Sequence, residues 1–229
     1  MNNTEISGNG ILPRAAEDDD IQDRSADTAV SDIIPRTIAD KYKNEISSAA
    51  TLLAVTAVAG SSLATLAYHI KKDGHWILSG TMPAVIGRGG ITPDKKESDM
   101  MTPSGCFDIP YAFGNLPDPG CRLDYRIITP DDYYVDDPNS QYYNTWVSTG
   151  CPGNDFISAE HLCEVRPEYD YAAVIDYNHE RVPGNGSAVF LHCTGHNQYT
   201  AGCVALDTEN MIRILTTMLP PVRIVIMQV

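Results

Sequence analysis

Basic residues are scarce in this chain. Sixteen Lys and Arg stand against 30 Asp and Glu in 229 residues, which gives a net charge of −14. Nucleic-acid binders neutralise phosphates with cations, and anionic membrane surfaces attract basic segments, so this composition argues against both kinds of partner. The apolar fraction of 43% is ordinary for a packed globular protein and excludes a chain that is disordered throughout.

Cysteine is also sparse, and the six cysteines form no Cys-x-x-Cys pair. That spacing marks zinc ribbons and thioredoxin-like redox sites, so neither is predicted. The even number permits disulfides in an oxidising compartment, but the sequence does not define their pairing. One or two disulfides are consistent with the four cysteines of the loop-rich section, Cys106, Cys121, Cys151 and Cys163.

The N-terminus lacks the basic start and apolar run of a secretory signal peptide. Residues 1–47 contain ten acidic and five basic side chains, a net charge of −5, with few aromatics. Such a segment buries too little apolar surface to fold alone. We therefore predict a disordered acidic tail over residues 1–47 and one folded domain over residues 48–229.

Long apolar runs are missing except between residues 46 and 70, where no charge occurs. The length would suit a membrane crossing, but Ala, Ser and Thr dominate and Gly60 is followed by two serines. The pattern favours two strands joined by a turn at Gly60. Membrane contact is therefore not expected.

Short apolar segments separated by Gly-rich and Pro-rich loops predict a mainly β fold. Further strands are expected at residues 75–78, 82–87, 171–178, 187–192 and 222–229, with a break at Ser79-Gly80 between the first two. One helix is predicted after Asp207, which can cap it, and before Pro220. Its apolar face consists of Met211, Ile214, Leu215 and Met218.

The best candidates for catalytic residues lie between positions 187 and 206. His192 ends an apolar strand, and Cys203 follows on the returning segment, with ten residues between the two, across a hairpin-like loop. A thiol becomes nucleophilic when a base removes its proton, and an imidazole at this spacing can do so. Gly202 removes a side chain beside the sulfur and leaves room for a carbonyl and for oxyanion donors. The alternative, that both residues only pack the core, is equally open from spacing alone.

At these positions the sequence resembles the L,D-transpeptidase (YkuD-like) catalytic domain family. The matching residues are His192 at a strand end and the run Thr200-Ala201-Gly202-Cys203-Val204. Upstream blocks resemble one branch of the same family, and the resemblance extends from about Thr51 to Val229. These blocks are VIGRGG (85–90), KKESDMMTPSGCF (95–107), VDDPNSQYYN (135–144), SAEHL (158–162), AAVIDYN (172–178) and VPGNGSAVFLH (182–192).

The resemblance implies an L,D-transpeptidase-like β-sandwich or barrel with a C-terminal helix after the catalytic cysteine. It implies a cysteine acyltransferase on peptidoglycan stem peptides, with Cys203 as nucleophile and His192 as general base. The backbone carbonyl of Cys193 would hold His192 in its tautomer, and N–H groups around Gly202 and Cys203 would form the oxyanion hole. Thr200 belongs to the same substrate-binding motif. Neither a metal nor another cofactor is implied.

Several residues depart from the family pattern. Ala201 and Ala205 replace a His and an Asn or Arg, and Ser98 and Met100 replace two glycines. Two alternatives therefore remain open: a peptidoglycan L,D-carboxypeptidase or endopeptidase, including a secreted toxin, and a non-catalytic wall-binding domain. The substrate implies the periplasm or the extracellular cell envelope as location, reached by an export route that the sequence does not reveal.

Other candidate site residues carry weaker patterns. Tyr142 and Tyr143 fit a substrate groove and core or rim packing equally well. A zinc site built on His192, Cys193, His196 and Cys203 is disfavoured because the segment lacks a helical pattern. His161 is interpreted as a loop or packing residue.

Overall fold

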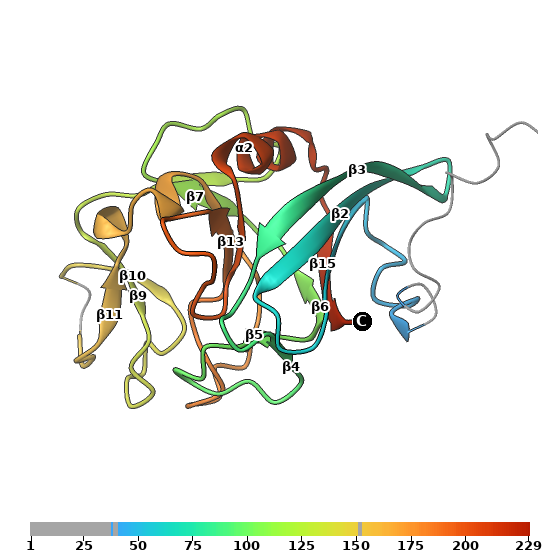
Figure 1. The fold of residues 1–229 in the computed structure, drawn as a ribbon. Coiled ribbons are helices and arrows are strands. Elements are labelled where there is room, and N and C mark those ends of the chain that lie inside the picture. Colours follow the sequence, from blue (N-terminus) through green and yellow to red (C-terminus); the bar gives the residue numbers. More distant parts are fainter. Residues whose placement is uncertain (1–37, 39–40, 151–152) are drawn as a thin grey trace, which may run out of the picture.

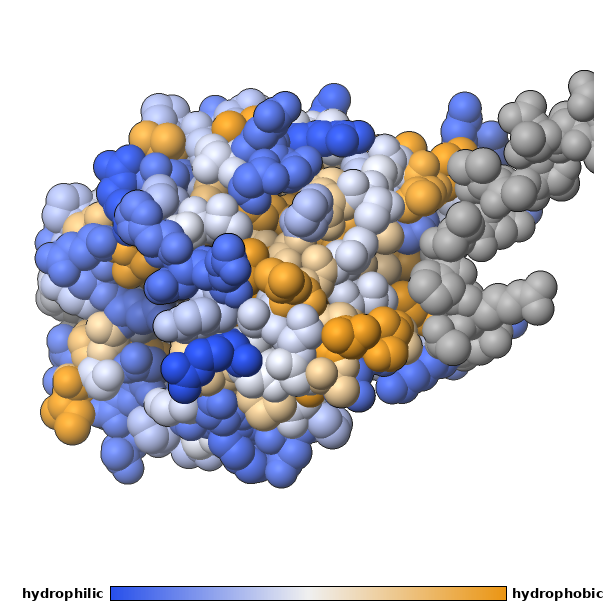
Figure 2. Space-filling model, viewed as in Figure 1, coloured by the Kyte–Doolittle hydropathy of each residue, from blue (hydrophilic) through white to orange (hydrophobic). Residues whose placement is uncertain are grey.

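The computed structural model describes residue 38 and residues 41–150 and 153–229. Strands dominate this part of the chain, and the largest sheet curls into a half-barrel with a short helix against one face (Figure 1). The mainly β fold with a helix after Cys203 is therefore confirmed. The face seen in Figure 2 is mostly hydrophilic with separate apolar patches, as the acidic composition leads one to expect.

The large sheet has ten strands in the order β6-β15-β1-β2-β3-β14-β13-β12-β7-β8. In chain order these strands are β1 (Thr51–Ala57), β2 (Leu63–Lys72), β3 (His75–Val85), β6 (Gly105–Asp108), β7 (Ala112–Gly114), β8 (Tyr125–Ile127), β12 (Ala172–Val174), β13 (Phe190–Cys193), β14 (Val204–Leu206) and β15 (Val222–Gln228).

Two small sheets and three helical segments complete the described part of the chain. One sheet has the order β10-β9-β11, and the other pairs β4 with β5. Their bounds are β4 (Ile91–Thr92), β5 (Thr102–Pro103), β9 (Asp132–Val135), β10 (Trp146–Ser148) and β11 (Ala159–His161). The helical segments are η2 (Leu162–Glu164), η3 (Glu168–Asp170) and α2 (Thr208–Thr217).

The uncharged stretch between residues 46 and 70 forms the antiparallel pair β1 and β2, as predicted. Its two faces alternate: Leu66 and Tyr68 enter the larger core, and Ala67 packs on the other side. Among the described residues, no helix combines the length and the apolar character that a membrane crossing requires.

The predicted break at Ser79-Gly80 is wrong, because β3 runs through it from His75 to Val85. Tyr68 of β2 pairs with Gly80 while the next residue, His69, pairs with Leu78. Ser79 is therefore the extra residue of a β-bulge. Ser and Gly at this point accommodate a bulge instead of a turn, a distinction that composition alone does not make.

Helix α2 follows the predicted pattern. The Asp207 side chain caps it by accepting a hydrogen bond from the Asn210 N–H at 2.8 Å. The buried face consists of Met211, Ile214 and Leu215, and the helix ends before Met218. It connects β14 to β15, which runs parallel to β1.

Two hydrophobic cores lie on opposite faces of β13 and of the neighbouring segment that begins at Cys203 and continues into β14. Leu191, Cys193 and Val204 belong to the larger core, together with the buried face of α2. Phe190 and Cys203 belong to a smaller core. Because strand side chains alternate, this arrangement leaves His192 on the same face as Phe190.

The predicted acidic tail lies mostly outside the described residues. Within it, Ile38, Tyr42 and Ile46 are buried against Leu52 and Ala54 of β1. The domain boundary at residue 47 stays a prediction. The described cysteines are free thiols, and Cys151 lies outside the described residues.

Candidate active site

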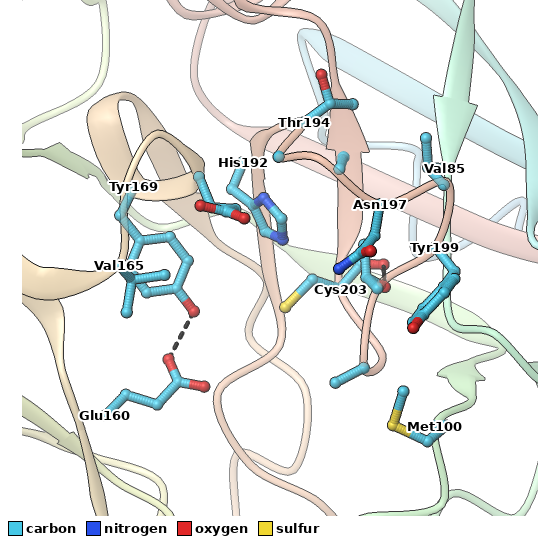
Figure 3. A pocket seen from close by; sticks show the side chains of 15 residues that line it. Val85, Met100, Glu160, Val165, Tyr169, His192, Thr194, Asn197, Tyr199 and Cys203 are labelled. Atoms are coloured by element: carbon cyan, nitrogen blue, oxygen red, sulfur yellow. Dashed lines mark hydrogen bonds between the residues drawn. The ribbon is translucent and has the colours of Figure 1, made fainter.

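His192 and Cys203 come together because β13 and β14 are neighbouring strands. The strands run parallel, with Leu191 opposite Val204 and His192 opposite Ala205. The predicted hairpin-like arrangement is therefore wrong: residues 194–203 carry the chain back before β14 begins. Both side chains nevertheless line one cavity of about 290 Å³ (Figure 3).

The His192 ring is buried and fixed by the backbone. Its Nδ1 lies 2.7 Å from the carbonyl oxygen of Cys193. Burial lowers the pKa of His192, against the opposite influence of this carbonyl and of Glu168, so the neutral form is favoured. In a neutral imidazole that donates from Nδ1, Nε2 carries the lone pair, as a general base requires.

The Cys203 thiol rests on main-chain partners. Among the described residues, Sγ donates to the Ala188 carbonyl at 3.2 Å and accepts from the Phe190 N–H at 3.3 Å. Burial first, and then the charge of Glu160, raise the pKa of Cys203 to about 12 against the lowering effects of the Phe190 N–H and Lys95. The resting sulfur is therefore a protonated thiol that needs a base.

The turn before Cys203 is held by Thr200. Its Oγ1 donates to the Cys203 carbonyl at 2.7 Å and accepts from the Gly202 N–H at 3.1 Å. A Cβ at Gly202 would lie 2.9 Å from the Met101 carbonyl oxygen, closer than such contacts occur. Glycine therefore serves close packing here, and its N–H is already engaged.

A second cavity of about 220 Å³ adjoins the first at Cys203. Charged side chains line it: Lys95, Glu97, Asp136 and Glu160. The buried Lys95 ammonium pairs with Asp99 at 2.6 Å. One carboxylate oxygen of Asp136, Oδ1, is buried and has no hydrogen-bond partner among the described residues. The site thus combines one paired cation with three carboxyl groups.

Glu160 lines both cavities and accepts a hydrogen bond from the Tyr169 hydroxyl at 2.5 Å (Figure 3). Burial raises the pKa of Glu160 to about 7; the nearby charges of Asp136 and Glu97 act in the same direction, and the Tyr169 hydroxyl opposes them. The Tyr169 ring meets His192 edge-on, with ring centroids 5.6 Å apart. The Glu160 carboxyl group, with its pKa near neutral pH, therefore lines the same cavities as the Cys203 thiol.

The two predicted groove tyrosines do not line either cavity. Tyr143 is buried and its hydroxyl donates to Glu97, so it reaches the second cavity only through that carboxylate. Tyr142 precedes it in the turn before β10. The role of both in substrate binding stays a prediction.

Sequence reasoning assigned no role to Lys95, Glu97, Glu160 or Tyr169. The first three lie in the blocks 95–107 and 158–162, which resemble the family, and that resemblance was the available signal. Neither periodicity nor spacing brings these loops to Cys203.

The alternative zinc site is not assembled. His192 and Cys193 are successive residues of one strand, and their side chains point to opposite faces. Within residues 38, 41–150 and 153–229, no three His, Cys, Asp or Glu side chains are grouped to hold a metal ion.

Comparison with known proteins identifies a family. The YkuD model, the L,D-transpeptidase catalytic domain, matches residues 62–226. No curated protein matches the chain.

Similar solved structures share little sequence with the chain. An L,D-transpeptidase from Mycobacterium smegmatis is 16% identical with a TM-score of 0.37; the match covers 78% of this chain and 59% of that protein. Bd1075 of Bdellovibrio bacteriovorus is 14% identical with a TM-score of 0.41, covering 76% and 47%. L,D-transpeptidase 1 of Mycobacterium tuberculosis is 16% identical with a TM-score of 0.33, covering 77% and 62%. The chain thus spans less than two thirds of each.

Proposed function

We propose, from the premise that this chain belongs to the YkuD family of L,D-transpeptidase catalytic domains, that it is a cysteine acyltransferase on peptidoglycan stem peptides. Cys203 attacks the carbonyl of the L-centre of diaminopimelate in a tetrapeptide stem and expels D-alanine. The thioester then acylates an amine of a neighbouring stem, which gives a 3→3 cross-link. This chemistry takes place in the cell envelope, where peptidoglycan lies.

The observation that carries the proposal is the buried pair of a neutral imidazole and a thiol on one cavity. His192 Nε2 accepts the Cys203 proton as the sulfur attacks and returns it to the leaving amine. The Cys193 carbonyl keeps Nδ1 protonated throughout, so Nε2 is the nitrogen that exchanges the proton. Because the pKa of Cys203 is raised to about 12, proton removal has to accompany attack.

The oxyanion is proposed to form beside the turn 200–203. The Gly202 N–H donates to Thr200 Oγ1, so in this proposal the main oxyanion donor is the Cys203 N–H. Thr200 then acts by holding the turn through its bond to the Cys203 carbonyl. This assigns Thr200 a positioning role.

The second cavity supports an amine as the acyl acceptor. Glu97, Asp136 and Glu160 give it carboxylate character, whereas its one ammonium group is already paired with Asp99. An acceptor stem presents an ammonium group, which carboxylates attract before it loses its proton to attack the thioester.

Product analysis tests the proposal. The protein is incubated with a disaccharide-tetrapeptide, and the products are separated and their masses are measured by mass spectrometry. We expect dimers that have lost one D-alanine, and no such dimers with Cys203→Ala. Absence of both dimers and released D-alanine from the folded parent would contradict the proposal and favour a non-catalytic wall-binding domain.

Hydrolysis is the second candidate, favoured by one observation. Ala201 and Ala205 both line the first cavity, so these two positions offer an acceptor stem no polar side chain. Water could then take the acyl group, as in an L,D-carboxypeptidase. Free tripeptide with D-alanine and no dimers, even at high concentration of stem, would support this candidate against transpeptidation.

A further inference from the structure

A second cysteine–histidine pair lies outside the candidate active site. The Cys163 sulfur is 3.2 Å from His161 Nε2, and His161 Nδ1 is 3.0 Å from a carboxylate oxygen of Glu164. The Tyr133 ring stacks on the imidazole with centroids 4.4 Å apart and planes 8° from parallel. Of the five described cysteines, Cys163 is the one whose sulfur lies within hydrogen-bond distance of a histidine nitrogen.

The hydrogen bonds at His161 define its protonation. Nε2 also lies 2.7 Å from the carbonyl oxygen of Pro130, which can only accept, so Nε2 carries a proton. Nδ1 faces the Glu164 carboxylate, which likewise accepts. Both nitrogens therefore donate, and the ring is an imidazolium. The Pro130 carbonyl, and then Glu164 and Asp131, raise the pKa of His161, in agreement with this geometry.

An imidazolium beside a sulfur stabilises the thiolate, which is the reactive form of cysteine. We propose that Cys163 is a reactive thiol that exchanges with small disulfides from solution, the carboxylates of Glu164 and Asp131 favouring cationic ones. The thiolate attacks one sulfur of the disulfide, a mixed disulfide forms, and the other half leaves as a thiolate. Two electrons pass from the cysteine to the disulfide, and the proton stays on His161.

Exposure and charge support this assignment. Cys163 is half-buried, and the side chains of His161 and Glu164 are 25% and 75% exposed, so a small reagent can approach from solvent. Successive residues of β11 point to opposite faces, so His161 faces away from Glu160 and the Cys203 cavities. The proposal therefore does not depend on the proposed acyltransferase activity.

The other described cysteines supply internal controls. Burial raises the pKa of Cys106 to about 11 and, with a hydrogen bond to Asp118, raises the pKa of Cys121 to about 12. Both should react slowly at pH 6, because their thiolate fractions are very small. Cys163 should react faster than either of them at this pH, because the imidazolium of His161 lies beside its sulfur.

The experiment measures mixed-disulfide formation with cystamine, a cationic disulfide, at pH 6 and pH 8. Cleavage before aspartates releases the peptide 155–169, which contains Cys163 and no other cysteine. We expect its adduct to form at least about tenfold faster at pH 6 than adducts at Cys106 or Cys121. Dithiodipropionate, an anionic disulfide of similar size, should react more slowly than cystamine.

Two variants test the role of the ring. His161→Phe keeps a flat ring for Tyr133 but removes both N–H groups, and it should slow the Cys163 reaction at pH 6 about tenfold or more. Glu164→Gln changes an exposed side chain, so we expect it to preserve folding and to give a smaller decrease in the Cys163 rate. A Cys163 rate no faster than that of Cys121 would overturn the proposal. An unchanged rate of Cys163 reaction in both variants would also overturn it. If His161→Phe fails to fold, an unchanged rate in Glu164→Gln alone would do so.

Discussion

At the scale of single residues, the environment of each group determines its protonation. His192 and His161 illustrate this, because burial lowers the pKa of the first and a carbonyl and a carboxylate raise the pKa of the second. The neutral ring suits a base that must accept a proton, and the charged ring suits a partner that stabilises a thiolate. The sequence places both next to cysteines but does not distinguish these environments.

Glu160 provides a test of electrostatics at the thiol. Its pKa is raised to about 7, so at pH 8 it is charged, and its charge raises the pKa of Cys203. We expect Glu160→Gln to speed alkylation of Cys203 by iodoacetamide about threefold or more at pH 8. At pH 5.5 the parent carboxyl group is already protonated, so the two rates should agree.

The control for this prediction is alkylation of Cys106, which the substitution should leave unchanged. Peptide mapping after timed quenching separates the two cysteines. Equal Cys203 rates for parent and Glu160→Gln at pH 8 would show that this carboxylate does not act on the thiol.

At the scale of elements, the loop between β4 and β5 holds the Lys95 ammonium beside the turn 200–203. Asp99 pairs with Lys95 and accepts hydrogen bonds from the Lys96 and Met101 N–H groups. Burial alone would raise the pKa of Asp99, but these bonds lower it overall. The carboxylate therefore stabilises the fold above its unfolded pKa near 4, and this contribution is lost as the pH falls through the lower folded value.

We expect Asp99→Asn to lower the free energy of unfolding at pH 7 by about 3 kcal/mol, because a buried ammonium loses its partner. Urea unfolding followed by circular dichroism measures the change. Lys96→Gln is the matched control, since its ion pair with Asp94 is exposed and should contribute little. A loss below about 0.5 kcal/mol for Asp99→Asn would contradict the buried pair.

The same loop contains two residues in the left-handed region, Ser98 and Met100, both with φ of 60°. These are the positions where the family pattern has glycine, so the structure explains that preference. We expect Ser98→Gly to raise the free energy of unfolding by about 0.5–1 kcal/mol, because glycine adopts this backbone without steric cost. Urea unfolding measures this change, and a lower free energy of unfolding for Ser98→Gly than for the parent would contradict it.

The elements that the sequence predicted are those with local signals. Helix α2 has a capping Asp207, an apolar stripe and a stop, and the β1–β2 pair has a turn at Gly60. The bulge at Ser79 and the parallel pairing of β13 with β14 were missed, because both depend on how neighbouring strands pair, and composition specifies neither their direction nor their register. Lys95, Glu97 and Glu160 reach Cys203 for the same reason: tertiary packing places them there.

At the scale of the whole molecule, the larger hydrophobic core and the candidate active site lie on opposite faces of the same strand. The larger core lies on one face of β13 with α2, whereas His192 and Cys203 occupy the other face beside the cavities. Because His192 belongs to β13 and Cys203 directly precedes β14, in a sheet that the larger core stabilises, we expect the site residues to be replaceable without unfolding. This is why single substitutions can test the mechanism.

The most direct measurement is the mass of the acyl-enzyme. The protein is mixed with a tetrapeptide stem, quenched in acid, and its peptides are mapped by mass spectrometry. We predict a thioester of the stem, without its terminal D-alanine, on Cys203. His192→Ala should keep the fold and slow its formation about 100-fold or more. D-Alanine release at an undiminished rate from folded Cys203→Ala, or an acyl adduct on a different residue, would contradict the account.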